Sequence, residues 1–236
     1  NASVNLPKSI GRELRLAIDI KGSLLESKEW SGALYLKTEQ LQSQQWLQQL
    51  SWQGSSIQQG TLDLELWSQW QGGELESVEG HLQAVNLVLA RGKQRDAFPL
   101  LSTDLQLLHR GDGWQLNVAG LRLQHADKMA SPMYLSLNYS PEEFMLSAQK
   151  VQLGPLGALL PYLPQLDERM QEMVHTMAPS GEVNGLHFRR TAPQHIEFQA
   201  ELSAVAIAPW KRLPGLQGIG GILRFNGEQG HLELHT

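Results

Sequence analysis

The chain of 236 residues contains no cysteine, which excludes disulfide bonds and thiolate chemistry. Charged residues make up only 18% of it, and the formal net charge is -5. No cluster of Lys and Arg alternates with aromatic residues, so a nucleic-acid groove is excluded and no nucleic acid is expected as a partner. No segment approaches the run of roughly 18 to 20 apolar residues that spans a bilayer. These absences leave the cellular compartment open.

The motifs of catalysis are missing as well. No Gly-x-Ser-x-Gly nucleophile elbow occurs, and the adjacent Glu142 and Glu143 follow a proline in an expected turn, where solvent surrounds them. The glycines of residues 215–221 lead into a strand pattern, whereas a dinucleotide-binding loop opens a helix. We therefore expect neither an enzyme nor a bound cofactor.

A metal site is the next candidate, at the end of the chain. His231, Glu233 and His235 alternate along one expected strand and share one side of it. Two histidines at this spacing can share a zinc ion, but a closed site needs three or four ligands, and no partner spacing is visible. We interpret these residues as the polar side of a strand whose other side carries Leu232 and Leu234, and expect no metal.

What the sequence does have is leucine, with 41 copies against 17 of isoleucine plus valine. The leucines recur at every second position, most clearly in residues 60–67 and again in residues 14–20, 103–107 and 230–234. This spacing gives a helix no apolar face but places every leucine on one side of a strand. The pattern predicts a mainly β fold with short helices, in which a long twisted antiparallel sheet has one apolar face.

The pattern also divides the chain. We interpret residues 1–5, which begin without methionine, as a tag remnant and flexible lead-in. Residues 6–153 are expected to form an antiparallel meander, with a short helix near residues 40–50 where the apolar spacing changes period. Residues 154–179 form a proline-rich break with an amphipathic helix, and residues 180–236 continue the meander and end within a strand pattern.

Turn signals fix the hairpins of the meander. Gly72-Gly73 is expected to join two long strands between residues 60 and 90, and Asp112-Gly113 is among the strongest hairpin signals. The second hairpin places Leu105 and Leu107 opposite Leu116 and Val118. Irregular apolar spacing near residues 79–80 predicts a β-bulge, which bends a long strand.

The helix of the break, after Pro164, carries Leu166, Met170, Met173, Val174 and Met177 on one face. Methionines suit contact with lipid chains or a partner, although an apolar helical stripe is more often simple core packing. Acidic residues dominate its other face, which disfavours docking on an anionic membrane surface.

Seven tryptophans offer a third kind of surface, a platform for sugar rings. Trp67 and Trp70 differ in parity, so a regular strand places them on opposite sides and they cannot form one flat platform. We interpret most of the tryptophans as core or rim residues.

The order and spacing of several glycine, leucine and tryptophan phrases resemble the AsmA-like family, in its YhdP branch. The resemblance covers nearly all of residues 6–235, and no single phrase is specific by itself. The phrases are Leu6-Pro7-Lys8 before residues 11–19, Trp30 to Leu36, Leu64 to Trp70 before Gly72-Gly73, and Pro209 to Gly215 followed by Gly218 and Gly221.

The resemblance implies an internal fragment of a protein that an N-terminal transmembrane helix anchors in the inner membrane of a Gram-negative envelope. It implies a sheet curled into an apolar groove that carries phospholipid across the periplasm, with no catalytic motif. An uncovered apolar face needs a hydrophobic ligand or a partner, because large bare apolar patches are rare on soluble monomers, and acyl chains would meet that need. The residues expected to line the groove are Leu62, Leu64, Leu66, Leu105, Leu107, Leu116 and Val118.

Two other functions stay open. A scaffolding or assembly module would bind envelope proteins through exposed strand edges. A carbohydrate-binding β module would use the tryptophans.

Overall fold

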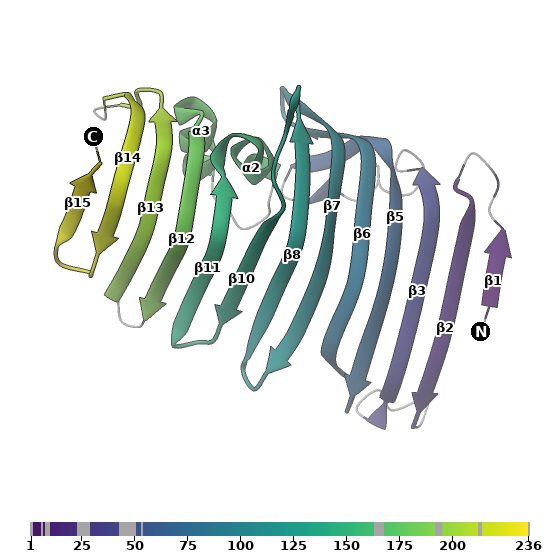
Figure 1. The fold of residues 1–236 in the computed structure, drawn as a ribbon. Coiled ribbons are helices and arrows are strands. Elements are labelled where there is room, and N and C mark those ends of the chain that lie inside the picture. The colour runs from purple at the N-terminus through teal and green to yellow at the C-terminus, as the bar shows by residue number, and fades with distance from the viewer. Residues whose placement is uncertain are drawn as a thin grey trace. The chain divides into compact units, whose positions relative to one another are not determined.

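The structure is a computed structural model and describes residues 2–5, 7, 10–22, 29–42, 51–52, 54–162, 168–191, 195–211 and 214–235. The chain divides into two compact units, Asn1–Leu121 and Arg122–Thr236. Antiparallel strands dominate both units, and in the described residues the second unit also has two short α-helices (Figure 1). The predicted fold class, mainly β with short helices, is confirmed.

The first unit is a meander in which each long strand pairs with the next long strand of the chain, in the order β1-β2-β3-β5-β6-β7-β8, while the short β4 pairs with β5. A helix was expected near residues 40–50. Its first three residues, 40–42, are instead the end of β3, and residues 43–50 lie outside the described residues. The strands are β1 (Ala2–Asn5), β2 (Glu13–Lys21), β3 (Ser31–Gln42), β4 (Ser51–Trp52), β5 (Ser55–Gln71), β6 (Glu74–Arg91), β7 (Gln94–Arg110) and β8 (Gly113–His125), whose last residues belong to the second unit.

Both predicted hairpins of this unit are present. Gly72 and Gly73 lie between β5 and β6, with φ of 61° and 77°. Glycine adopts these left-handed angles without the steric penalty that a Cβ brings. Gly111 and Asp112 separate β7 from β8 and form a two-residue turn. The turn chemistry thus sets where the long strands reverse.

The β-bulge predicted at residues 79–80 is wrong, because β5 and β6 stay in regular register there, with Trp67 opposite Glu79 and Leu66 opposite Gly80. The irregular apolar spacing has another cause further along β6. Asn86 has a φ of 53°, and the inner apolar residues change from even positions before it to the odd positions Leu87 and Leu89 after it. A left-handed residue interrupts the alternation of a strand.

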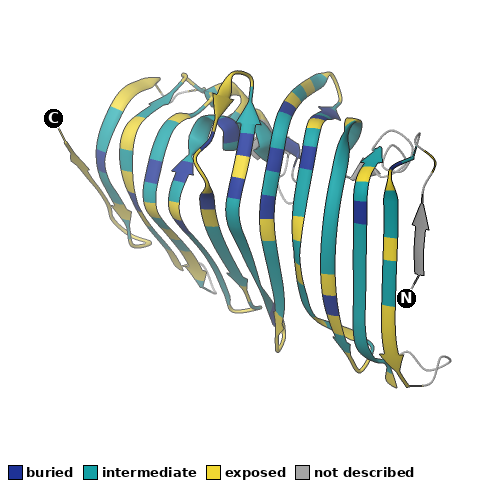
Figure 2. Cartoon of the chain, turned by 45° about the vertical axis from the view of Figure 1, so that its right-hand side comes forward, coloured by how far each residue is buried: buried dark blue, intermediate teal, exposed yellow. Residues whose placement is uncertain are grey.

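The most buried apolar residues of the first unit lie on both sides of this change of phase. Phe98, Leu87 and Leu89 are buried beyond it, and Ala84 and Leu101 are buried just before it. Leu87 and Phe98 are directly paired between β6 and β7. Figure 2 shows that buried positions occupy short stretches of the strands, while most of each strand is only half-buried.

The second unit continues the pattern in the order β10-β11-β12-β13-β14-β15, and the short β9 pairs with β8. A helical segment separates β11 from β12 (Figure 1). The elements are β9 (Lys128–Met129), β10 (Met133–Tyr139), β11 (Glu143–Gln152), α2 (Leu153–Leu159), the 3-10 helix η2 (Leu160–Tyr162), α3 (Glu168–Met177), β12 (Ser180–Thr191), β13 (His195–Ile207), β14 (Leu216–Phe225) and β15 (Gly230–Leu234).

The helices cover part of this unit. The helix predicted after Pro164 is α3, with Met173, Val174 and Met177 more buried than the residues between them. Helix α2 was not predicted, because residues 153–161 are rich in proline and glycine. It contacts β11 and β12, and α3 contacts α2 and η2. Among the described residues, no helix has the length and apolarity needed to cross a membrane.

Candidate functional site: an apolar sheet face

The seven predicted groove residues gather on one face of the first unit. Residues directly opposite each other on antiparallel strands project to the same face, so pairing across successive strands defines rows of side chains. One row runs from β2 to β7 through Leu16, Leu36, Leu66, Gly80 and Leu105, and its neighbours run through Ile18, Leu34, Ser68, Val78 and Leu107 and through Leu14, Thr38, Leu64, Leu82 and Thr103. A shorter row runs through Leu41, Leu62, Ala84 and Leu101.

The hairpin of β7 and β8 extends two of these rows. Its two-residue turn aligns Leu107 with Leu116 and Leu105 with Val118. A hydrogen bond from Asn117 Nδ2 to Gln106 Oε1, 3.0 Å long, fits the same alignment on the opposite face. All seven predicted residues therefore lie in neighbouring rows of one face, which we call the leucine face and define by the rows above.

Exposure distinguishes the leucine face from a packed core. Leu62, Leu64 and Leu66 are half-exposed, and so are the other four predicted residues. Phe98, beyond Asn86, is fully buried. Core leucines lose nearly all contact with solvent, whereas these seven residues keep part of it, although Thr38, Ser68, Thr103, Ala84 and Leu101 in the same rows are buried. The rows listed above contain no charged residue.

The opposite face of the same strands is polar. Its central row runs through Arg15, Lys37, Glu65, His81 and Asp104. Lys37 Nζ lies 3.8 Å from Glu65 Oε2 and 3.7 Å from Glu39 Oε1, and His81 Nδ1 lies 2.8 Å from Asp104 Oδ1. Each of these exposed pairs contributes little stability, but together they keep this face charged and hydrated.

An aromatic pair interrupts the polar face. Trp67 is 48% exposed, and its ring centroid lies 5.3 Å from that of Tyr35 on the neighbouring strand. The Tyr35 hydroxyl donates a hydrogen bond of 2.6 Å to Glu65 Oε1, which raises the pKa of Tyr35 to about 12. Trp70 is paired with Gly32 and projects to the leucine face, so the predicted separation of Trp67 from Trp70 is confirmed.

The second unit has an apolar face of its own, built largely from phenylalanine. Its main row runs through Leu137, Leu146, Phe188, Phe198 and Phe225, and we call it the aromatic row. Phe144 joins it from the next row, with its ring 6.0 Å from that of Phe188 and edge-on to it. Our sequence prediction did not include these residues. The alternation that identified the leucines also places Phe188 and its neighbour His187 on different faces of the strand.

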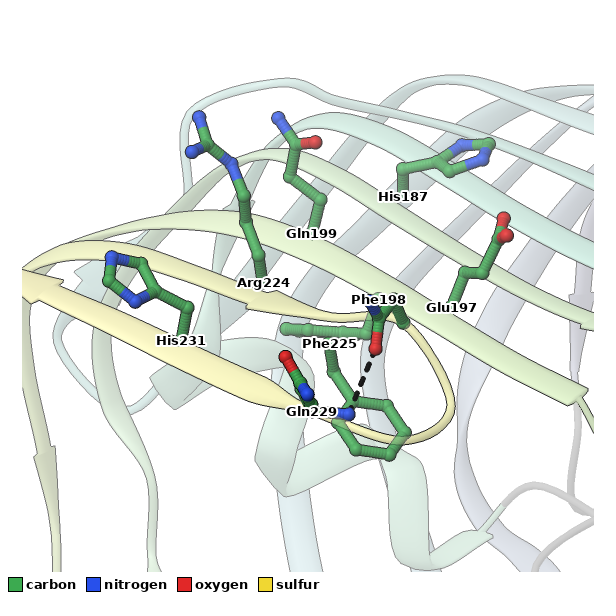
Figure 3. A pocket seen from close by; sticks show the side chains of 9 residues that line it. His187, Glu197, Phe198, Gln199, Arg224, Phe225, Gln229 and His231 are labelled. Carbon is green, nitrogen blue, oxygen red and sulfur yellow. Dashed lines mark hydrogen bonds between the residues drawn. The ribbon is translucent and has the colours of Figure 1, made fainter.

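The alternation of the two faces is visible in the second unit (Figure 3). The side chains of His187, Gln199, Arg224 and His231 stand on one side of the strands, and the ring of Phe225 lies on the other. These four polar residues form one directly paired row and line a shallow hollow. Each strand thus separates a polar surface from an apolar one.

Nothing in the described part of the chain assembles a reactive centre. No group of three or more His, Cys, Asp or Glu side chains there is placed to hold a metal ion. Glu143, one of the paired carboxylates, accepts a hydrogen bond from Arg189 Nε, 2.5 Å long. His231, Glu233 and His235 are exposed, on and just after β15.

The fold and the site define a class of protein: an antiparallel sheet with one polar face and one apolar face whose leucines stay partly exposed. A sequence model of the family described as "YhdP protein" matches residues 1–236, and the chain belongs to this family. Over 216 residues it is 22% identical to the "Intermembrane phospholipid transporter YhdP" of Escherichia coli (strain K12). The alignment covers 86% of the chain but only 17% of that relative. No solved structure matches the chain.

Proposed function

We propose that this chain is a segment of a bridge-like protein that carries phospholipid between the inner and outer membranes of a Gram-negative envelope. The acyl chains lie along the leucine face, which acts as the apolar wall of a groove. The observation that carries this proposal is the run of half-exposed, directly paired leucines that contains no charged residue.

The physical chemistry of the leucine face suits a lipid in motion. Each CH₂ group removed from water contributes about 0.8 kcal/mol, whichever leucine it touches. Because this attraction is non-directional, an acyl chain can move from one row to the next without breaking a specific bond. The polar opposite face keeps the sheet hydrated. Together the two faces support a carrier that holds lipid without fixing it.

The relative supports the same substrate, since its name describes an intermembrane phospholipid transporter. The whole protein, with this chain as its periplasmic part and an inner-membrane anchor elsewhere, is part of the proposal. Envelope proteins are its proposed partners. Family membership favours lipid transport over the scaffolding module that the strand edges also suggest.

Site-specific photo-crosslinking in the full-length protein tests the proposal. Leu64 and Trp67 are each replaced by p-benzoylphenylalanine in cells, and the adducts formed on irradiation are identified by mass spectrometry. Both positions lie on β5 and both are apolar, but Leu64 belongs to the leucine face and Trp67 to the polar face. We expect phospholipid adducts at Leu64 and few or none at Trp67.

Protein adducts without lipid at Leu64 would support the scaffolding module and overturn the proposal. Equal lipid labelling at both positions would mean that the leucine face does not bind lipid in preference to the polar face. Leu64→Asp provides a functional readout, because a carboxylate on a half-exposed face should block lipid movement while the protein still folds. Wild-type transport by this variant would also contradict the proposal.

A further inference from the structure

The apolar rows of the second unit contain one charged residue among those described, Arg190. It is directly paired with Phe144 on one side and with Ile196 on the other. It also lies two residues beyond Phe188 of the aromatic row, so all four residues share one face. The rows of the leucine face in the first unit have no counterpart to this charge.

The preceding residue shows what a structural arginine does in this strand. Arg189 projects to the polar face, where its Nε bonds Glu143 Oε1 at 2.5 Å and its Nη1 lies 3.8 Å from Glu197 Oε2. The side chain of Arg190 makes no hydrogen bond or ion pair with any residue that the structure describes. Two adjacent arginines thus differ completely in their electrostatic surroundings.

The position of Arg190 is amphipathic. It is exposed near the end of β12, next to Ile196, which is 36% exposed, and in one row with Tyr139, which is 39% exposed and lies two strands away on β10. An arginine stem can lie along such apolar side chains while its guanidinium stays in water. A guanidinium without a carboxylate partner is a strong and often bidentate site for phosphate.

We propose that Arg190 binds the phosphate of a lipid whose acyl chains lie along the aromatic row. This inference rests on the proposed function and adds the residue that recognises the charged end of the substrate. A neutral lipid with the same acyl chains offers Arg190 no anion. Arg190 therefore gives the second unit a preference for phosphate-bearing lipids that the leucine face does not have.

The test uses the full-length protein with p-benzoylphenylalanine at Phe198 of the aromatic row. The protein is irradiated in dodecyl maltoside micelles with either dioleoyl phosphatidic acid or dioleoylglycerol, which differ only in the phosphate. We expect Arg190→Gln to lower the phosphatidic acid adduct about tenfold, the loss of one charge-assisted contact, and to leave the dioleoylglycerol adduct unchanged. Arg190→Lys should restore part of the loss.

Arg189→Gln is the matched control, since it removes the same charge one residue away on the opposite face. The inference is overturned if Arg190→Gln keeps the wild-type ratio of the two adducts or if Arg189→Gln lowers it equally. Excess inorganic phosphate should lower the phosphatidic acid adduct no further than Arg190→Gln does, because the acyl chains still hold the lipid. Complete loss of the adduct would overturn the inference, since the site would then bind free phosphate. Absence of both adducts in the parent protein would instead reject the proposed function itself.

Discussion

Among single residues, Gly80 shows how closely the leucine face is packed within its own plane. It lies between Leu66 and Leu105 in one row. A Cβ at this position would meet Leu66 Cδ2 at 2.5 Å and also the backbone oxygen of Glu65. The missing side chain leaves the space that the Leu66 side chain fills.

Gly80→Ala should therefore destabilise the protein by about 1–3 kcal/mol, as overpacking does. Urea unfolding followed by circular dichroism measures the change. Gly154→Ala is the matched control, because a Cβ there meets no atom within 4 Å and the residue lies in α2, where alanine is favoured. Equal midpoints for the two variants would contradict this account of Gly80.

Tyr35 makes stability depend on alkaline pH. Its hydrogen bond to Glu65 raises its pKa from 10.0 to about 12. A raised pKa in the folded state means that the contribution is complete below pH 10 and is lost as the pH rises towards 12. Unfolding midpoints measured across this range should fall more steeply for the wild type than for Tyr35→Phe. Parallel curves would show that the hydrogen bond has no such effect.

Among the elements, the long strands depend on a few left-handed residues that change the phase of their alternation. Asn86 has this role in β6, with a φ of 53°. The register of β6 with β7 is the same on both sides of it, so β7 changes phase with β6. This is how Leu87 and Phe98 come to lie in the core although simple alternation would place them on the other face.

Asn86→Val should destabilise the protein by about 1–3 kcal/mol, because a β-branched residue resists left-handed angles. Asn138→Val is the control, since Asn138 lies in β10 with an ordinary negative φ and valine suits a strand. Thermal unfolding measures both. If Asn138→Val lowered the stability as much as Asn86→Val, the left-handed backbone of Asn86 would not explain the effect.

These elements also show what sequence can predict. Alternating leucines and glycine turns were sufficient to locate the strands, because period-two spacing and left-handed turns are local properties. The phase change at Asn86 was missed because its signal is one ordinary residue with an unusual φ. Helix α2 was missed because Pro155 and Gly157 disfavour a helix locally, although Pro155 is buried and the helix contacts β11 and β12.

The candidate face was predictable only in part, for a related reason. Alternation places Leu64 and Leu66 on one face, but their half-exposure depends on what lies over them, which is a tertiary property. Phe188 and Phe198 follow the same alternation in the second unit but were not recognised as a face. Such residues form rows only through pairing between strands, and a single sequence does not reveal that pairing.

In the whole molecule, the contrast between core and carrying surface should be measurable as stability. Phe98→Ala should cost about 3–5 kcal/mol because Phe98 is fully buried. Leu64→Ala should cost only about 1 kcal/mol, since Leu64 already meets solvent. Urea unfolding of the two variants tests the difference. Equal losses would mean that the leucine face is an ordinary core.

The meander order of the strands has a consequence for how the chain is made. Within each unit nearly every strand pairs with the strand that precedes or follows it in the chain, so a strand rarely needs a partner that is synthesised much later. Such pairings can form while the ribosome is still adding residues. Each hairpin that emerges can attach to the open edge left by the one before. The sheet can therefore grow by accretion, in the direction of translation, without waiting for a distant partner strand.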